Sequence, residues 1–357
     1  MRRSLIPLIL LALPVIYFAG CVPKFNKQIK YRPDQISYAK TDDGWKLVVY
    51  HLPPSAPRKD ALPIIMCHGF TSTSVTFDQG DGLGLGPYLA ARGYDVWLVN
   101  LRGHAPDNSP IEDQRKPYGW TVDDYIHHDV PALIDHVCRQ TGARQVTWIA
   151  HSMGGIVAYG YLGSSRDQRV ARMIAVASPV RFADYNDLLQ KLIVWLKPVV
   201  KPENGLTIHY MGRFASAEPS TTYHKYEMVV INPENIDRKK WRRYLDYSLT
   251  DISGGVALQL ADWTTRDVMV SRDGNTDYRR EMKNIKFPLL VIAGQLDGLA
   301  PPAISRPALD WVGSDKKEFK LIGLASGAQT DYGHLDLLIG PRVEQEVFPT
   351  IADWLAQ

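Results

Sequence analysis

The chain has 357 residues, which is enough for one large α/β domain with an insertion or for two ordinary domains. Hydrophobic residues make up 45% of it, and its tryptophan, tyrosine and glycine content is typical of a globular enzyme with a substantial core. The formal net charge of +3 is close to neutral for this length, so the composition argues against a general role in binding nucleic acid or another polyanion.

The N-terminus has the pattern of a bacterial signal peptide. Two arginines precede an apolar run from Leu5 to Ala19, which is shorter than the ~20 residues that a membrane-spanning helix needs. The run leads into Cys21 through a sequence that resembles a lipobox, in which the cysteine is lipidated after residues 1–20 are cleaved. Phe18 stands where an aliphatic residue is usual, so a simple secretory signal and an uncleaved anchor are alternatives. We expect a lipoprotein held at the membrane of the bacterial cell envelope through Cys21, the alternative being a secreted or periplasmic protein.

Residues Lys24–Arg32 are polar and basic, and we expect residues 21–33 to link the lipidated terminus to the folded body. If Cys21 carries lipid, Cys67 and Cys138 are the remaining cysteines, and their positions favour free thiols over a disulfide. The sequence has no CxxC motif and no cluster of histidine and cysteine, so we expect neither a metal site nor a cofactor.

The first folded segment is expected to be a hairpin. Alternating apolar residues predict two edge strands over Ile36–Lys40 and Trp45–His51, joined by a turn. Ile64–Cys67 is a short apolar run typical of a central parallel strand. Helical spacing over Leu83–Arg92 and a further apolar run over Tyr94–Leu101 complete a strand–helix–strand pattern.

The same alternation continues along the chain. Four more strands are predicted in the run that begins at Val146 and over Met173–Val176, Pro288–Ala293 and Lys316–Leu321, with helices around Ile126–Val137, after Ser152 and over Val343–Leu355. Pro131 predicts a kink early in the first of these helices. Strands and helices that alternate in this way predict a mostly parallel sheet flanked by helices.

The alternation fails between Arg181 and Lys286. We interpret residues 181–286 as a helical cap inserted between two core segments, 34–180 and 287–357. The most apolar part of this cap, Leu188–Val200, is expected to form a buried helix, with a lid helix that meets lipid or an acyl chain as the alternative. In that alternative, the side chains lining the substrate pocket are Leu192, Trp195 and Leu196.

Ser152 ends the apolar run that begins at Val146, and apolar residues at helical positions follow it. A strand, a sharp turn and a helix would place the serine hydroxyl in front of the helix N-terminus, the geometry of a nucleophile elbow. Gly154 fits this geometry because the elbow leaves little room for a Cβ. Ala150 stands where glycine is usual, and an N-cap serine after a buried strand is the alternative interpretation.

A serine hydroxyl is a poor nucleophile near pH 7, so it needs a base, an acid that orients the base, and donors for the developing oxyanion. His334 lies in a loop after the last predicted strand and can accept the proton of Ser152. Asp297 follows an earlier strand and can orient the imidazole. The expected oxyanion donors are the backbone N–H groups of Phe70 and Met153.

Other residues of the same types compete for these roles. The competing interpretations are an acid at Asp184, Asp331 or Asp336 and a base at His68 or His151. The aspartates are better explained as loop or cap-forming residues, and the two histidines as structural residues beside the oxyanion loop and the nucleophile.

Six blocks of the sequence together carry a family resemblance. They are His68–Phe70, Tyr94–Leu98 with Arg102 and Gly103, Asp129–Asp135, Ala150–Gly154, Asp297–Ala300 and Gly333–Leu337. The blocks resemble the α/β-hydrolase lipases of the acid-lipase type, and also polyhydroxyalkanoate synthases, which have a cysteine where this chain has Ser152. The resemblance implies an α/β-hydrolase fold, a triad of Ser152, Asp297 and His334, and hydrolysis of an ester with a long acyl chain.

We therefore expect a serine hydrolase that cleaves carboxylic esters, of lipids or other long-acyl compounds, through an acyl-enzyme. The alternatives are an acyltransferase or thioesterase on the same fold, and a catalytically inactive surface lipoprotein used for binding. The expected partners are the acyl-ester or lipid substrate and the membrane, with no nucleic acid. The fold by itself does not determine the substrate, and the sequence leaves the oligomeric state open.

Overall fold

The structure is a computed structural model, which describes residues 29–105, 109–110, 119–183, 197–203, 205–206 and 227–357. The predicted signal peptide, Cys21 and most of the predicted linker lie outside these ranges. Among the helices within them, none is both long enough and apolar enough to cross a membrane.

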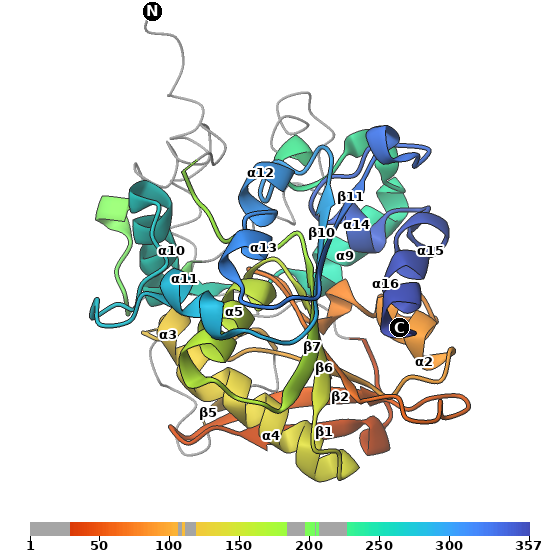
Figure 1. The fold of residues 1–357 in the computed structure, drawn as a ribbon, viewed down its shortest axis with the longest axis horizontal. Coiled ribbons are helices and arrows are strands. Elements are labelled where there is room, and N and C mark those ends of the chain that lie inside the picture. Colours follow the sequence, from red (N-terminus) through yellow and green to blue (C-terminus); the bar gives the residue numbers. More distant parts are fainter. Residues whose placement is uncertain (1–28, 106–108, 111–118, 184–196, 204, 207–226) are drawn as a thin grey trace, which may run out of the picture.

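One large sheet runs through the middle of the molecule (Figure 1). Its strand order is β1-β2-β4-β3-β6-β7-β10-β11, and the short β5 pairs with β2. The strands are β1 (Ile36–Lys40), β2 (Trp45–Leu52), β3 (Ile64–Cys67), β4 (Val96–Val99), β5 (Ser109–Pro110), β6 (Val146–His151), β7 (Val170–Val176), β10 (Leu289–Gly294) and β11 (Lys317–Ile322). From β4 to β11 all neighbouring strands are parallel, whereas β2 is antiparallel to β1, β4 and β5. This is the mostly parallel sheet that the sequence predicted.

The N-terminal hairpin differs from the prediction in one respect. β1 pairs with β2 in antiparallel register, from Ile36 opposite Tyr50 onwards, and lies at the edge of the sheet. β2 also pairs with β4, with Val49 opposite Val99, so it is an inner strand and the prediction of two edge strands was wrong. The three consecutive residues Leu47–Val49 are fully buried, which fits a strand that is covered on both faces.

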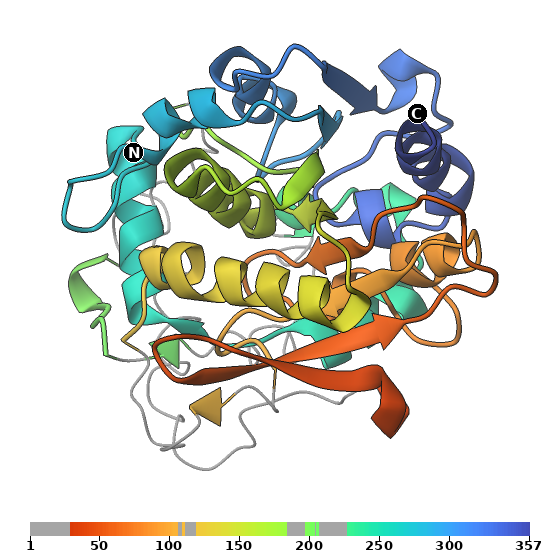
Figure 2. The same ribbon diagram turned by 60° about the horizontal axis from the view of Figure 1, so that its bottom comes forward.

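Helices cover both faces of the sheet (Figure 2). The core on one face contains Leu133 of α4 and Val157 of α5, and the core on the other face contains Leu89 of α2 and Phe348 of α16. The α-helices are α2 (Leu85–Ala90), α3 (Val122–Asp124), α4 (Val130–Thr141), α5 (Met153–Ser165), α9 (Arg238–Ser248), α10 (Gly254–Arg266), α11 (Tyr278–Glu281), α12 (Pro302–Ser305), α13 (Ala308–Trp311), α14 (Asp336–Ile339), α15 (Val343–Glu346) and α16 (Phe348–Leu355). Short 3-10 helices are η1 (Pro33–Gln35), η2 (Ser74–Thr76), η4 (Lys197–Val199), η5 (Pro233–Asn235), η6 (Met282–Asn284) and η7 (Leu324–Ser326), and η3 (Tyr125–Asp129) is a π-helical turn.

Two prolines account for irregular helices. Pro131 lies in the first turn of α4, and the π-helical turn Tyr125–Asp129 precedes it, so the predicted kink takes the form of a wider turn. A proline has no N–H to donate to the preceding turn, which favours an irregular entry into the helix. Pro349 likewise lies where α16 begins, and α15 and α16 replace the single helix predicted over Val343–Leu355.

The described parts of the predicted cap pack against the core of the molecule. α10 contributes Val256 and Trp263 to the same core cluster as α5, and α11 contacts α5 directly. Two short strands, β8 (Gly205–Leu206) and β9 (Ile252–Ser253), pair in antiparallel fashion within this part of the chain. The three residues predicted to line a substrate pocket, Leu192, Trp195 and Leu196, lie outside the described residues.

Arg102 carries a buried charge that holds three segments together. Its guanidinium is 2% exposed and contacts Asp129 at the end of the π-helical turn (Nη2 to Oδ1, 2.7 Å) and Asp43 in the β1–β2 turn (Nη1 to Oδ2, 2.6 Å). The backbone N–H of Arg102 also donates to Asp129 Oδ2 at 2.8 Å. The loop after β4 is therefore fixed relative to the hairpin and to the entry of α4.

Replacement of Asp129 by asparagine should strongly destabilise the fold. Asp129→Asn leaves Arg102 buried without its fully buried counter-charge, so we expect the free energy of unfolding to fall by about 3 to 5 kcal/mol. The matched control is Asp135→Asn, because Asp135 pairs with Arg139 and Arg169 at the surface, where an ion pair contributes about 0 to 1 kcal/mol. Urea unfolding followed by circular dichroism measures both variants, and equal losses would contradict the role given to Asp129.

Candidate active site

Ser152 lies on a sharp turn between β6 and α5, as predicted. β6 is buried along its whole length, and α5 begins at the next residue, Met153. The backbone of Ser152 has φ 52° and ψ −120°, a conformation that residues with a Cβ rarely adopt. Two hydrogen bonds hold it, from Ser152 N–H to Val176 O (3.0 Å) and from Gly155 N–H to Ser152 O (2.9 Å). The neighbouring strand and the first turn of α5 therefore sustain the strain at the serine.

Small residues make room for this turn. A Cβ on Gly154 would lie 2.4 Å from the carbonyl oxygen of Cys67, so glycine is required where the helix starts against β3. Ala150, the departure noted in the sequence, is fully buried, and its neighbour in register on β7 is Ala175, another small residue. Gly69 lies against the nucleophile itself, because a Cβ there would be 2.9 Å from the Cβ of Ser152. The loop that carries Phe70 therefore runs beside Ser152.

His334 and Asp297 form a buried pair. His334 Nδ1 lies 2.9 Å from Asp297 Oδ2 and 3.1 Å from Oδ1, and the two side chains are 4% and 0% exposed. The carboxylate is itself fixed, because Asp297 Oδ1 accepts hydrogen bonds from the backbone N–H groups of Leu299 (2.8 Å) and Ala300 (2.7 Å). An aspartate held in this way can set the tautomer and the orientation of an imidazole.

The competing aspartates have other partners. Asp331 accepts a hydrogen bond from the Leu324 backbone N–H at 2.8 Å, and Asp184 lies outside the described residues. Asp336 accepts from the N–H groups of Gly333 (3.0 Å) and Asn232 (3.1 Å). The structure therefore brings Asp297 to His334 and gives Asp331 and Asp336 roles in shaping loops.

The loop of His334 also touches the elbow. His151, the residue before Ser152, is 1% exposed, and its Nε2 lies 3.2 Å from the carbonyl oxygen of His334. The two imidazole rings are tilted against each other with centroids 4.6 Å apart. Ser152, which follows β6, and His334, which follows β11, are thus linked at the same edge of the sheet.

Buried histidines shape the loop predicted to supply an oxyanion donor. His68 accepts a hydrogen bond from the Leu101 N–H at Nε2 (3.2 Å), and burial lowers the pKa of His68 to about 4, so it is neutral. His104 Nδ1 lies 3.0 Å from Ser72 O and 2.9 Å from Thr250 Oγ1. His68 therefore has a loop-shaping position, as expected, whereas no pattern in the sequence marked His104.

Like His104, Asp336 has a role that sequence reasoning missed. Its Oδ1 accepts from the N–H of Gly333 and from that of Asn232, and its Oδ2 accepts from Asn235 Nδ2 at 2.9 Å. These bonds join the loop of His334 to residues 232–235, which lie in the predicted cap just before α9. Burial is the main cause that raises the pKa of Asp336 to about 6. The sequence could not reveal this role because the two asparagines lie about a hundred residues away.

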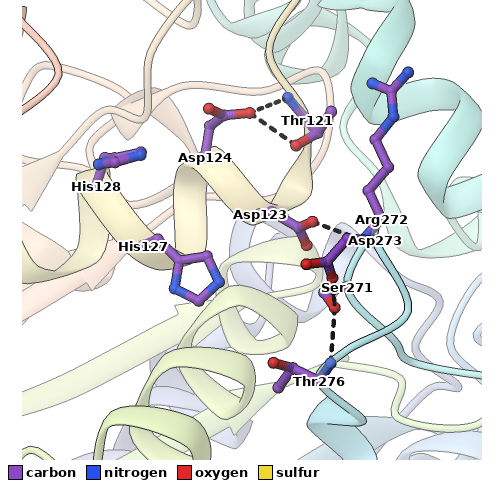
Figure 3. Close-up of a pocket in the computed structure, with 9 residues that line it drawn as sticks. All are labelled: Thr121, Asp123, Asp124, His127, His128, Ser271, Arg272, Asp273 and Thr276. Carbon is purple, nitrogen blue, oxygen red and sulfur yellow. Dashed lines mark hydrogen bonds between the residues drawn. The ribbon is translucent and has the colours of Figure 1, made fainter.

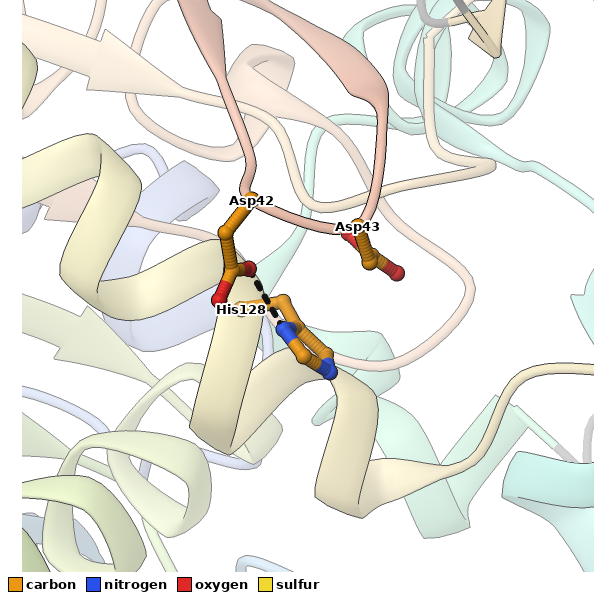
Figure 4. A group of neighbouring side chains, drawn as sticks. All are labelled: Asp42, Asp43 and His128. Atoms are coloured by element: carbon orange, nitrogen blue, oxygen red, sulfur yellow. Dashed lines mark hydrogen bonds and ion pairs between the residues drawn. The ribbon is translucent and has the colours of Figure 1, made fainter.

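A separate polar pocket of about 440 Å³ lies between α3, η3 and the loop around Ser271 (Figure 3). Its acidic groups are engaged locally: Asp124 accepts from Thr121, and Asp123 from the backbone of Arg272. Close by, Asp42, Asp43 and His128 offer ligand atoms within 4.8 Å of one another (Figure 4). Asp43 pairs with Arg102, and Asp42 is hydrogen-bonded to His128 (2.6 Å), so these contacts explain the group.

The two cysteines among the described residues have ordinary structural positions. Cys67 at the end of β3 is buried and Cys138 in α4 is half-buried, and both are free thiols. Burial raises the pKa of each thiol, so neither is an activated nucleophile. Free thiols are what their positions in the sequence favoured.

Asp336 should make stability depend on pH. Its pKa is about 6 in the folded protein and near 3.8 when solvated, so the folded state binds the proton more tightly. Its contribution to stability is therefore complete below about pH 4 and is lost as the pH rises through 6, a change of up to about 3 kcal/mol. We expect wild type to lose stability relative to Asp336→Asn over this interval in urea unfolding, and not relative to Asp353→Asn, an exposed control on α16. A pH-independent difference between wild type and Asp336→Asn would contradict this.

Comparison with known proteins places the chain in a family. It matches the family model described as alpha/beta hydrolase fold over residues 63–325. Tear acid lipase-like protein of Mesocricetus auratus is 25% identical over 305 residues, which cover 73% of this chain and 74% of that protein. Poly(3-hydroxyalkanoate) polymerase subunit PhaC of Haloferax mediterranei is 22% identical over 340 residues, 91% of this chain and 64% of that protein. A solved esterase from Exiguobacterium antarcticum shares the fold, with a TM-score of 0.58 and 17% identity over 90% of this chain and 99% of its own. The chain is therefore a member of the α/β-hydrolase fold family, similar in sequence to its lipases.

Proposed function

We propose that this protein hydrolyses carboxylic esters, with Ser152 as nucleophile, His334 as general base and Asp297 as the residue that orients the base. The observation that carries the proposal is the buried contact of His334 Nδ1 with Asp297 (2.9 Å) beside the strained turn at Ser152. A buried histidine–aspartate pair can have a purely structural role elsewhere. Here it accompanies a serine held in a rare backbone conformation, which is typical of functional sites.

The reaction follows from these positions. Ser152 Oγ attacks the ester carbonyl carbon while His334 Nε2 accepts the hydroxyl proton, and the carbonyl oxygen becomes the oxyanion of a tetrahedral intermediate. The backbone N–H groups of Phe70 and Met153 donate to that oxyanion. The intermediate collapses as His334 returns the proton to the leaving alkoxide, which departs as an alcohol and leaves an acyl-serine. Water, deprotonated by His334, then releases the carboxylic acid and restores Ser152.

Electrostatics favour this sequence of steps. Asp297 is buried, and its negative charge stabilises the imidazolium that forms on His334 during each proton transfer. Its two backbone donors, Leu299 and Ala300, keep the carboxylate in place when His334 changes charge. α5 begins directly after Ser152, so the positive end of its helix dipole faces the developing oxyanion.

The substrate we propose is an ester with a long acyl chain, including lipid esters. The similarity to the lipases supports this class, and the cap residues Leu192, Trp195 and Leu196 are the proposed lining of the acyl pocket. Acyl transfer is the second candidate, because PhaC of Haloferax mediterranei, a polymerase by name, is similar over 91% of this chain. Transfer would use the same acyl-serine and differ only in its acceptor, an alcohol or thiol in place of water.

The triad is tested by single substitutions. Ser152→Ala and His334→Ala should each lower kcat for p-nitrophenyl butyrate by about 10³-fold or more, because the groups act as a unit. Asp297→Asn should also be severe, since an amide misorients the imidazole tautomer. The matched controls are Ser164→Ala at the far end of α5 and His136→Ala on α4, which should leave kcat unchanged. Ester turnover near the wild-type rate in Ser152→Ala would refute the nucleophile, and an inactive but folded wild type would favour a binding protein.

We also propose that the protein is a lipoprotein attached to the membrane of the bacterial cell envelope. A single acyl chain binds a bilayer only marginally, whereas a diacylated and further acylated cysteine supplies enough buried methylenes for stable attachment. Cys21→Ser should therefore yield protein without lipid, either soluble or held by an uncleaved signal peptide. Intact mass spectrometry and membrane fractionation measure this. Wild-type protein that retains residues 1–20 and carries no lipid mass would contradict the proposal.

A further inference from the structure

His151 lies where three functional segments meet. It is the last residue of β6, it precedes Ser152, and its ring is 1% exposed. On one side the ring faces the backbone of Gly69, where a Cβ would lie 3.0 Å from His151 Nδ1. On the other side it faces the loop of His334, with ring centroids 4.6 Å apart. The elbow, the loop of Phe70 and the loop of His334 therefore all pack on one imidazole.

The hydrogen bond of His151 determines its protonation. His334 O can only accept, so the hydrogen bond at 3.2 Å requires the proton of His151 to be on Nε2. Nδ1 then carries a lone pair, and it has no hydrogen-bond partner among the described residues. The absence of a Cβ on Gly69 is what allows the loop to pass this close to Nδ1.

Two side chains hold the backbone of the loop around His334. Asp336 accepts from the N–H of Gly333 on one side, and His151 donates to the carbonyl of His334 on the other. The hydrogen bonds of Asp336 and of His151 connect the loop of His334 to different parts of the molecule. Asp336 connects the loop to residues 232–235, whereas His151 belongs to the same turn as the nucleophile.

We propose that His151 is a positioning residue for the ester hydrolysis proposed above: its Nε2–H bond to the carbonyl of His334 sets the distance between the base and Ser152. The inference rests on that proposed function. Because His151 is adjacent to Ser152 in the chain, its hydrogen bond to the backbone of His334 connects the nucleophile and the base directly, with no other residue in between. A misplacement of about 1 Å between reacting groups can cost about 10²-fold in rate, so this restraint belongs to the reaction geometry.

The neutral state of His151 fits this role. Burial lowers the pKa of His151 well below its usual value, and the nearby His334 and His68 lower it further. When His334 becomes an imidazolium during catalysis, a neutral neighbour adds no repulsive charge at 4.6 Å. Asp297 then is the only ion-pair partner of His334 among the described residues.

The test separates a hydrogen bond from simple filling of space. Glutamine can place its Nε2 where histidine has Nε2, whereas asparagine reaches only the position of Nδ1, and phenylalanine fills the volume without a donor. In the full-length protein with p-nitrophenyl butyrate, His151→Gln should retain kcat within about fivefold, whereas His151→Asn and His151→Phe should lose about 10- to 100-fold. KM should change little in all three, because the restraint acts on the reacting groups rather than on substrate binding.

A distant buried histidine provides the matched control. His136 on α4 is 5% exposed and hydrogen-bonded to Ser37 Oγ at 2.8 Å, so His136→Phe removes a comparable ring and bond away from Ser152 and should leave kcat unchanged. If His151→Phe does not fold, the glutamine and asparagine pair decides the matter, with thermal unfolding confirming that both are folded. Equal kcat for glutamine and asparagine, or full activity of folded His151→Phe, would overturn the inference while the proposed function stands. A wild type that hydrolyses no ester and is not labelled by a fluorophosphonate would overturn both.

Discussion

The backbone turn at Ser152 is the constraint on which the rest of the structure depends. A left-handed φ on a residue with a Cβ is unfavourable, so the turn persists only because its surroundings determine it. Val176 on β7 accepts its N–H, Gly155 donates to its carbonyl, and Gly154 lets α5 start against the end of β3. The contacts with Val176 and with the end of β3 depend on the parallel strands on either side of β6. The hydrophobic core that covers these strands therefore also holds the backbone of Ser152 in its unfavourable conformation.

The base and its partner arrive at this turn along the same sheet. Asp297 follows β10 and His334 follows β11, and parallel strands deliver the segments after them to one edge of the sheet. Backbone N–H groups hold Asp297, while Asp336 and His151 hold the peptide groups around His334. The site is therefore held mainly by hydrogen bonds to backbone groups, which restrict the positions of its side chains.

Sequence reasoning was most successful where local pattern and chemistry agreed. It located β3 over Ile64–Cys67, the strand before Ser152, and Asp297 as the partner of His334 among four aspartates. It failed where the outcome depends on residues that are distant in the sequence. β2 lies inside the sheet only because β4 pairs with it. Asp336 holds the loop of His334 through hydrogen bonds from Asn232 and Asn235, which lie about a hundred residues earlier in the chain. Such pairings depend on tertiary packing, which a periodicity cannot encode. The proline effects were visible in the sequence, but whether Pro131 produces a kink or a π-helical turn depends on what packs around it.

The central claim is that Ser152 is the nucleophile, and covalent labelling tests it most directly. The wild-type protein would be treated with a fluorophosphonate, which captures only a serine activated by a neighbouring base, and then mapped by peptide mass spectrometry. The account predicts one adduct per chain, on the peptide that contains Ser152, and its disappearance in His334→Ala. An adduct on a different residue, or the absence of any adduct on protein that still hydrolyses esters, would contradict the account.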